Sequence, residues 1–193
     1  MKSDRCVALF VDRRGPYFDL VDECWDADRD ATTYDGDHPA VMHPPCARWS
    51  VMAHLVEKWH GYPKREDGGL FESALRTLDR VGGVIEHPAK SMAWDEFGLP
   101  KPQGIGWWTG DMFKRYVSAR VNQCNYGHAM LKPTWLLMRK SDPLPKLSKG
   151  IGTGRNFGPG YEWIPRERPV RKTTPISFAK LLISAAEACN ADG

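Results

Sequence analysis

Residues 70–88 read LFESALRTLDRVGGVIEHP, and this stretch decides the fold class of the chain. Its first twelve residues place apolar side chains at the three-to-four-residue spacing of an amphipathic helix. Two glycines then end the helix, as glycine commonly does. A short apolar strand follows and runs into Glu86. A helix that passes through glycine into a buried strand is half of a β-α-β unit, so we expect an α/β protein.

Other segments of the chain fit the same fold class. Apolar runs predict strands at residues 6–11, 21–25, 40–42, 116–122 and 134–138. Helical spacing predicts helices at residues 49–59 and 176–189, and we expect the segment 89–115 to be irregular. Because strands and helices alternate, the sequence predicts a sheet with helices on both faces and a late antiparallel hairpin.

The chain of 193 residues suits one domain with an appendage. We expect a compact α/β domain at residues 1–140, a basic Gly- and Pro-rich arm at 141–174, and a C-terminal helix at 175–193 that packs back on the domain. The net charge is only +3, but residues 132–193 carry 11 basic and 5 acidic side chains. A basic surface of this kind suits phosphate groups and solvent equally well.

Several classes of protein are excluded by composition. No apolar run reaches the roughly 18 residues of a membrane span, and the first residues lack a secretory signal, so we expect a cytoplasmic protein. The five cysteines are scattered and form no Cys-x-x-Cys pair, which argues against a disulfide framework or a zinc ribbon. The histidines and the cysteine between residues 38 and 60 match no standard zinc spacing, so we predict no metal site.

Two residues that follow buried strands are the strongest candidates for chemistry, because ligands of α/β sheets bind beyond the carboxyl ends of strands. Cys46 follows residues 40–42 through two prolines that fix the backbone, in AVMHPPCARW. It is either a nucleophile with a lowered pKa or a buried, inert cysteine. Glu86 is either a functional acid or an ion-paired surface group.

The order of these motifs resembles the cytosine-C5 DNA methyltransferase family. In this chain PPC comes first, a Gly-Gly strand ending in Glu-His-Pro comes second, and NQCNYG at residues 122–127 precedes the hairpin. The family holds its nucleophile in a Pro-Cys loop, its base-recognising acid at a strand end, and an Asn-x-x-x-Tyr-Gly segment before a later strand. Short bacteriophage proteins with His-Pro-Pro-Cys and Glu-His-Pro look similar throughout.

The resemblance implies a Rossmann-like methyltransferase sheet and an enzyme that acts on a pyrimidine base of DNA or of a nucleotide, in the host cell if a phage encodes it. Cys46 would attack C6 of an extruded cytosine, Glu86 would share a proton with N3, and S-adenosylmethionine would supply a methyl group to C5. The residues implied to bind the cofactor are Asp12, Gly15 and Asp26. The residues implied to contact nucleic acid are Arg48, Lys132, Arg139, Lys140 and Arg155.

The sequence departs from the family pattern in ways that leave two alternatives open. Gly15 is the lone glycine in a loop that should read Phe-x-Gly-x-Gly, and His87 stands where the family has asparagine. The large target-recognition domain is absent. One alternative is a catalytically degenerate relative that only binds nucleic acid. The other is a base-modifying enzyme of the same fold that does not use S-adenosylmethionine.

Overall fold

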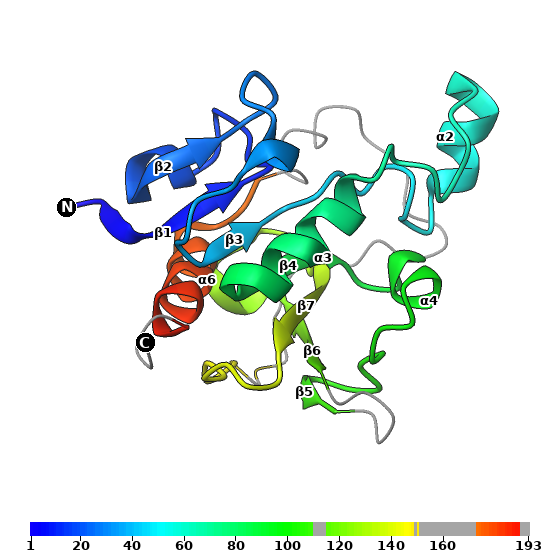
Figure 1. Cartoon of the computed structure of the whole chain (residues 1–193). Helices are drawn as coiled ribbons and strands as arrows, with labels where there is room; N and C mark the ends of the chain where they lie inside the picture. Colours follow the sequence, from blue (N-terminus) through cyan, green and yellow to red (C-terminus); the bar gives the residue numbers. More distant parts are fainter. Residues whose placement is uncertain (110–114, 149, 151–172, 190–193) are drawn as a thin grey trace.

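The structure is a computed structural model that describes residues 1–109, 115–148, 150 and 173–189. These residues form an α/β fold with a seven-stranded mixed sheet in the order β2-β1-β3-β4-β7-β6-β5 (Figure 1). The strands are β1 (Ser3–Leu9), β2 (Val21–Trp25), β3 (Ala40–Met42), β4 (Gly83–Pro88), β5 (Gly106–Trp108), β6 (Tyr116–Asn122) and β7 (Pro133–Arg139). The helices are α1 (Tyr17–Leu20), α2 (Ala53–His60), α3 (Leu70–Val81), α4 (Ala93–Glu96) and α6 (Ile176–Ala188), with 3-10 turns η1 (Ala31–Thr33) and η2 (Gln123–Tyr126).

The directions of the strands bring several chain segments to one edge of the sheet. β1 pairs in parallel with β2 and β3, and β3 pairs in parallel with β4. β7 runs antiparallel to both β4 and β6, so β6 points the same way as β4. The carboxyl ends of β1, β3, β4 and β6 therefore lie at the same edge, together with the first residues of β7.

The two faces of the sheet are covered by different helices, as alternation along each strand requires. Val84 packs in the cluster that contains Phe178 of α6, whereas its neighbour Ile85 packs in the cluster that contains Phe71 of α3. All four side chains are fully buried. Each face thus has its own core, and α3 and α6 hold β3 and β4 between them.

Most predicted elements agree with the structure, and the misses have physical causes. The helix expected at residues 49–59 is wrong at its start, because Trp49 lies in a turn in which its N–H bonds the Cys46 carbonyl at 3.1 Å, and α2 begins only at Ala53. Trp59 is 67% exposed on α2. The expectation of an irregular segment at 89–115 is also wrong, since it holds α4 and the edge strand β5, which forms by pairing with β6.

The C-terminal helix α6 contacts β1, β3 and β4, whereas most of the expected arm at 141–174 cannot be described. Residues 149 and 151–172, Arg155 among them, lie outside the described residues. No helix in the described ranges has both the length and the apolar character needed to cross a bilayer.

The junction between α3 and β4 gives a test of the fold. Gly83 has a φ of +112°, and a Cβ there would lie 2.0 Å from the backbone oxygen of Ala40 on β3. We expect Gly83→Ala to destabilise the protein by about 3 kcal/mol or more, since strand pairing must open to admit the methyl group. Urea unfolding followed by circular dichroism measures the change.

Gly61→Ala is the matched control for this substitution. Gly61 also has a positive φ of +68°, but a Cβ there meets nothing within 4 Å. Gly61→Ala should lower the free energy of unfolding by the backbone strain alone, about 1 kcal/mol. Equal losses for the two variants would contradict close approach of β3 and β4 at Gly83.

Candidate active site

Two polar side chains meet where β3 and β4 lie side by side. The register pairs Met42 with Ile85, so the next residues, His43 and Glu86, are level at the carboxyl edge of the sheet. Nδ1 of His43 lies 2.9 Å from Oε2 of Glu86. Both side chains are mostly buried, with 14% and 12% of their surface exposed. The contact therefore sits at the rim of the core.

The second oxygen of Glu86 is held from the far side of β7. Gln123, at the end of β6, donates through Nε2 to Oε1 of Glu86 at 3.0 Å and to the hydroxyl of Thr134 at 2.9 Å. One amide group has only two N–H donors, so both are used. The orientation of the carboxylate is thereby fixed by neighbours on two sides. Sequence analysis did not single out Gln123, although it lies in the quoted NQCNYG segment.

Tyr17 of α1 completes a chain of hydrogen bonds on the other side of His43. The Tyr17 hydroxyl lies 2.7 Å from Nε2 of His43, and the two rings are in tilted contact with centroids 5.0 Å apart. Tyr17 is buried. We refer to these three residues as the Tyr17–His43–Glu86 chain. Nothing in the sequence pattern of α1 marks Tyr17, because it reads as an ordinary core aromatic.

The charges around the carboxylate keep it ionised. Burial alone would raise the pKa of Glu86, but the His43 hydrogen bond and the positive charges of His43 and Lys132 hold it at about 2. The pKa of Tyr17 is raised well above its usual value by burial and by the nearby Glu86 charge, so its hydroxyl stays protonated. The site therefore contains one fixed anion surrounded by donors.

Lys132 interacts electrostatically with both Glu86 and Cys46. It lies just before β7, and its ammonium group donates to the carbonyl of Thr173 at 2.8 Å. Burial lowers the pKa of Lys132, and the negative charges of Glu86 and Cys46 oppose that change.

The turn that carries Cys46 is anchored by hydrogen bonds that link it to α3. Cys46 itself is half-buried, and its carbonyl accepts the N–H groups of Trp49 at 3.1 Å and of Ser50 at 2.9 Å. The indole of Trp49 is buried and donates to Asp67 at 2.7 Å, and Asp67 in turn binds the first N–H groups of α3. The position of the thiol thus depends on α3 as well as on the two prolines.

His87, the next residue on β4, has a neutral ring. It is buried beside Glu86, and its Nδ1 lies 2.7 Å from the Ser91 hydroxyl. Burial lowers the pKa of His87 to about 4, although the carbonyls of Pro44 and Pro45 partly oppose this. His87 is therefore neutral at neutral pH, and its ring faces the two prolines that precede Cys46. Its Nε2 is buried and has no hydrogen-bond partner among the described residues.

The residues expected to bind the cofactor lie near this edge, but their polar groups are already engaged. Asp12 accepts the N–H of Gly15 at its carbonyl, at 2.7 Å, and the N–H of Arg14 at its carboxylate, at 2.9 Å. Asp26 follows β2, and Arg13 donates to its Oδ2 at 3.0 Å. Its Oδ1 accepts the N–H groups of residues 28 and 29. The loop after β1 closes on itself.

The residues expected to contact nucleic acid are divided between two places. Arg48 and Lys132 lie at the edge that carries Cys46, and the Arg48 guanidinium stacks over the ring of Tyr62 at 4.6 Å. Arg139 lies at the opposite end of β7, where it binds the Asp142 carboxylate at 2.8 Å, and exposed Lys140 follows it. The structure thus does not bring these two into one surface with Lys132.

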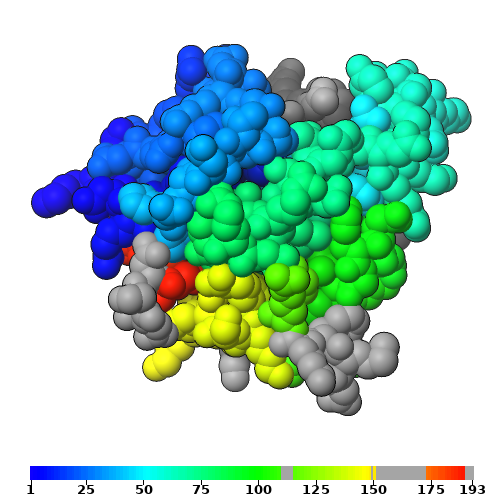
Figure 2. Space-filling model, in the orientation of Figure 1, coloured from blue at the N-terminus to red at the C-terminus, as the bar shows by residue number. Residues whose placement is uncertain are grey.

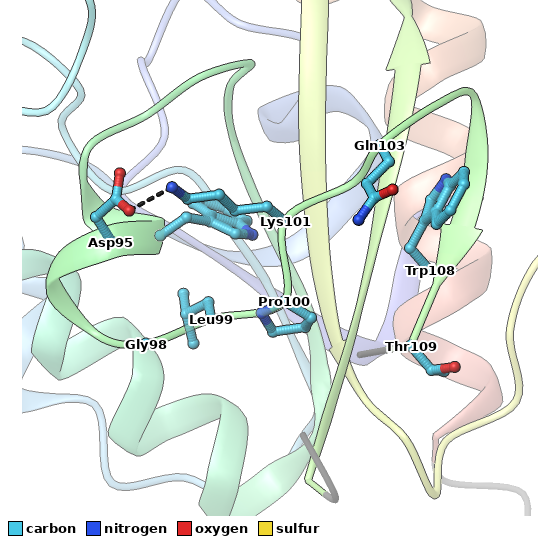
Figure 3. A pocket seen from close by; sticks show the side chains of 9 residues that line it. Asp95, Gly98, Leu99, Pro100, Lys101, Gln103, Trp108 and Thr109 are labelled. Carbon is cyan, nitrogen blue, oxygen red and sulfur yellow. Dashed lines mark hydrogen bonds and ion pairs between the residues drawn. The ribbon is translucent and has the colours of Figure 1, made fainter. Parts of the chain in front are cut away.

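Two hollows in the described part of the chain lie away from Cys46 and Glu86. One has a volume of about 380 Å³ and lies between α4 and β5, where Trp108, Gln103 and the ion pair of Asp95 with Lys101 line it (Figure 3). The other, of about 330 Å³, lies between the N-terminus and α6. Neither is lined by Cys46 or Glu86, so the chemistry of the edge marks the candidate site. Among the described residues, no cluster of three His, Cys, Asp or Glu side chains suits a metal ion.

The low pKa of Glu86 predicts how stability depends on pH. A carboxyl group whose folded-state pKa of about 2 lies below its ordinary value of 4.5 stabilises the fold above pH 4.5, and this contribution is lost as pH falls towards 2. It amounts to about 3 kcal/mol. Wild type should therefore lose more stability between pH 5 and pH 2 than Glu86→Gln.

Urea midpoints measured at each pH test this expectation. Glu72→Gln is the control, because Glu72 is 58% exposed on α3 and should leave the pH dependence of wild type unchanged. If Glu86→Gln and wild type have parallel stability curves, the carboxylate is not held ionised by its neighbours.

Comparisons with known proteins give no match on which a function could be based. No family model matches it, and no curated protein and no solved structure does either. The function must therefore be argued from the residues at the carboxyl edge of the sheet.

Proposed function

We propose that this chain is a cytosine-C5 DNA methyltransferase-like enzyme that activates a pyrimidine base in DNA or in a nucleotide. Cys46 is the nucleophile and Glu86 is the acid that holds the ring nitrogen. One observation carries the proposal: Glu86 lies at the carboxyl end of β4, and Cys46, forty residues earlier, lies in the turn that follows the neighbouring parallel strand β3. A thiol and an acid beside one another are what this chemistry requires.

The activation step uses only groups of the chain and the base. The Cys46 thiolate forms a bond to C6 of the ring. The π electrons of C5=C6 move to C4=C5, and those of C4=N3 move to N3, which takes a proton through Glu86. C5 is then an enamine carbon that reacts with an electrophile. Loss of the C5 proton, departure of the thiolate and return of the N3 proton to Glu86 restore the neutral aromatic ring.

Lys132 favours this step by its charge. An ammonium group beside Cys46 stabilises the thiolate over the thiol, and the thiolate is the nucleophilic form. The charge of Lys132 also helps to keep Glu86 ionised. Burial makes the charge more effective than it would be in water.

The fold is compatible with the proposal. A mixed sheet with helices on both faces, parallel from β2 to β4 and antiparallel from β7 to β5, is consistent with the Rossmann-like methyltransferase sheet that the resemblance implies. The candidate site also lies beyond the carboxyl ends of the strands, where ligands of such sheets bind.

S-adenosylmethionine is the methyl donor that the resemblance implies, but the residues after β1 and β2 do not fit it as they stand. The carboxylate of Asp26, implied to bind the ribose, is filled by Arg13 and by two backbone N–H groups. The N–H groups of Arg14 and Gly15 bond within their own loop. This observation favours a second candidate, a base-modifying enzyme that activates C6 in the same way and uses another electrophile.

DNA as the partner is supported by the surface next to Cys46. Helix α2 projects from the body, in cyan at the upper right (Figures 1 and 2). Trp59 is 67% and Tyr62 is 54% exposed there, among basic side chains such as Lys58. Exposed aromatic rings next to cations suit unstacked bases and phosphates. The catalytically degenerate relative would keep this surface and lack the base chemistry.

Release of tritium from C5 tests the activation step without any methyl donor. An oligonucleotide containing 5-tritiated deoxycytidine should lose label to water in the presence of wild type, because the enamine exchanges its C5 hydrogen. Cys46→Ser should reduce the release about a thousandfold or more and Glu86→Gln about a hundredfold. Cys124→Ser, a half-buried cysteine at another position, is the matched control.

The outcomes separate the candidates. No release by wild type, with DNA still bound, leaves the catalytically degenerate relative and contradicts the enzyme. Methyl transfer from S-adenosylmethionine in the same assay supports the methyltransferase. Release without such transfer favours the second candidate.

Arg48 and Lys140 should contribute differently to DNA binding. We expect Arg48→Ala to weaken binding severalfold and to lower the slope of log affinity against log salt by about one, as loss of one phosphate contact does. Lys140→Ala, at the opposite end of the sheet, should change neither quantity. Fluorescence anisotropy at several salt concentrations provides the measurement, and equal effects of both substitutions would contradict a binding surface around Cys46.

A further inference from the structure

We propose that His43 is the proton reservoir for Glu86, and that Tyr17 holds the His43 ring in the orientation that this role requires. The inference rests on the proposed function, because it identifies the source of the proton that N3 receives. His43 acts through Glu86 and is therefore a positioning residue. The geometry that points to it is the continuous Tyr17–His43–Glu86 chain, with contacts of 2.7 Å and 2.9 Å.

Glu86 needs such a reservoir because of its own contacts. Gln123 donates to Oε1, and that oxygen must therefore accept rather than carry a proton. The remaining position for a proton is Oε2, which faces Nδ1 of His43. A carboxylate held this way cannot protonate a ring nitrogen unless a neighbour refills it.

The proton transfer balances only when His43 is positively charged. Its Nδ1 proton passes to Glu86, and a proton passes from Glu86 to N3 as the thiolate adds to C6. His43 is left neutral, with its remaining N–H on Nε2 donating to the oxygen of Tyr17. If His43 were neutral at the start, Tyr17 would have to supply the proton. The raised pKa of the buried Tyr17 hydroxyl opposes this.

Few other ionisable groups in the described structure influence the pKa values of the Tyr17–His43–Glu86 chain. Lys132, before β7, and His87, on β4, act on Glu86, and His87 is neutral at neutral pH. Cys6 of β1 and Cys24 of β2 act on Tyr17, and burial raises the pKa of both thiols to about 11. Cys46 is coupled to the group through Lys132.

The pH profile of C5 tritium release distinguishes a reservoir from a merely structural ion pair. Wild type should give a bell-shaped profile, because Cys46 must lose its proton and His43 must keep its own. In His43→Asn, which retains a hydrogen-bonding side chain, we expect about a hundredfold lower release at pH 6 and no decline towards high pH. Tyr17→Phe should keep the decline but move its midpoint.

Two outcomes bear on the inference in this assay. A His43→Asn profile with the shape of wild type overturns it, even if the absolute rate is lower. Absence of release by wild type at every pH overturns the proposed function instead. Circular dichroism and urea midpoints show that each variant is folded.

Proton NMR of the histidine rings tests the reservoir without any substrate. The His43 resonance is assigned by its loss in His43→Asn, and its titration is compared in wild type and Glu86→Gln. Removal of the carboxylate charge should move the midpoint to lower pH by about one unit. An unchanged midpoint would show that His43 and Glu86 do not share a proton, and would overturn the inference whatever the DNA assay shows.

Discussion

The parallel pairing of β3 with β4 is the constraint on which the rest of the site depends. It makes His43 level with Glu86, and the two side chains then meet at 2.9 Å on the rim of the core. The close approach at Gly83 sets this register, because no side chain fits between the two strands there. Slippage by one residue would turn Glu86 to the other face and separate the groups.

The buried carboxylate shapes the chemistry of its surroundings. A low-dielectric position would favour the neutral acid, and only the donors around Glu86 reverse that preference. The same donors are the groups that a base-activating enzyme needs: an amide that orients the acid, a histidine that holds a proton and a lysine near the thiol. One arrangement thus serves both stability and the proposed reaction.

The contrast between the two halves of the expected methyltransferase site is informative. In the half that would act on the base, the carboxylate of Glu86 is held at the carboxyl edge of the sheet by His43 and Gln123. The half that would bind the methyl donor is closed by its own contacts, with Arg13 on Asp26. Our proposal therefore rests on activation of the base, and it treats the identity of the electrophile as a separate question for experiment.

The sequence by itself determined the α/β fold class and the bounds of α3 and β6, because periodicity and glycine act locally. It also singled out Cys46 and Glu86 as candidates, but only the tertiary structure decided which side chains lie beside Glu86. Tyr17, His43 and Gln123 belong to segments far apart in the chain, and no local pattern distinguishes a core tyrosine from one that bonds a histidine. Likewise, Arg139 and Lys132 look alike in sequence, but antiparallel β7 carries them to opposite ends of the sheet.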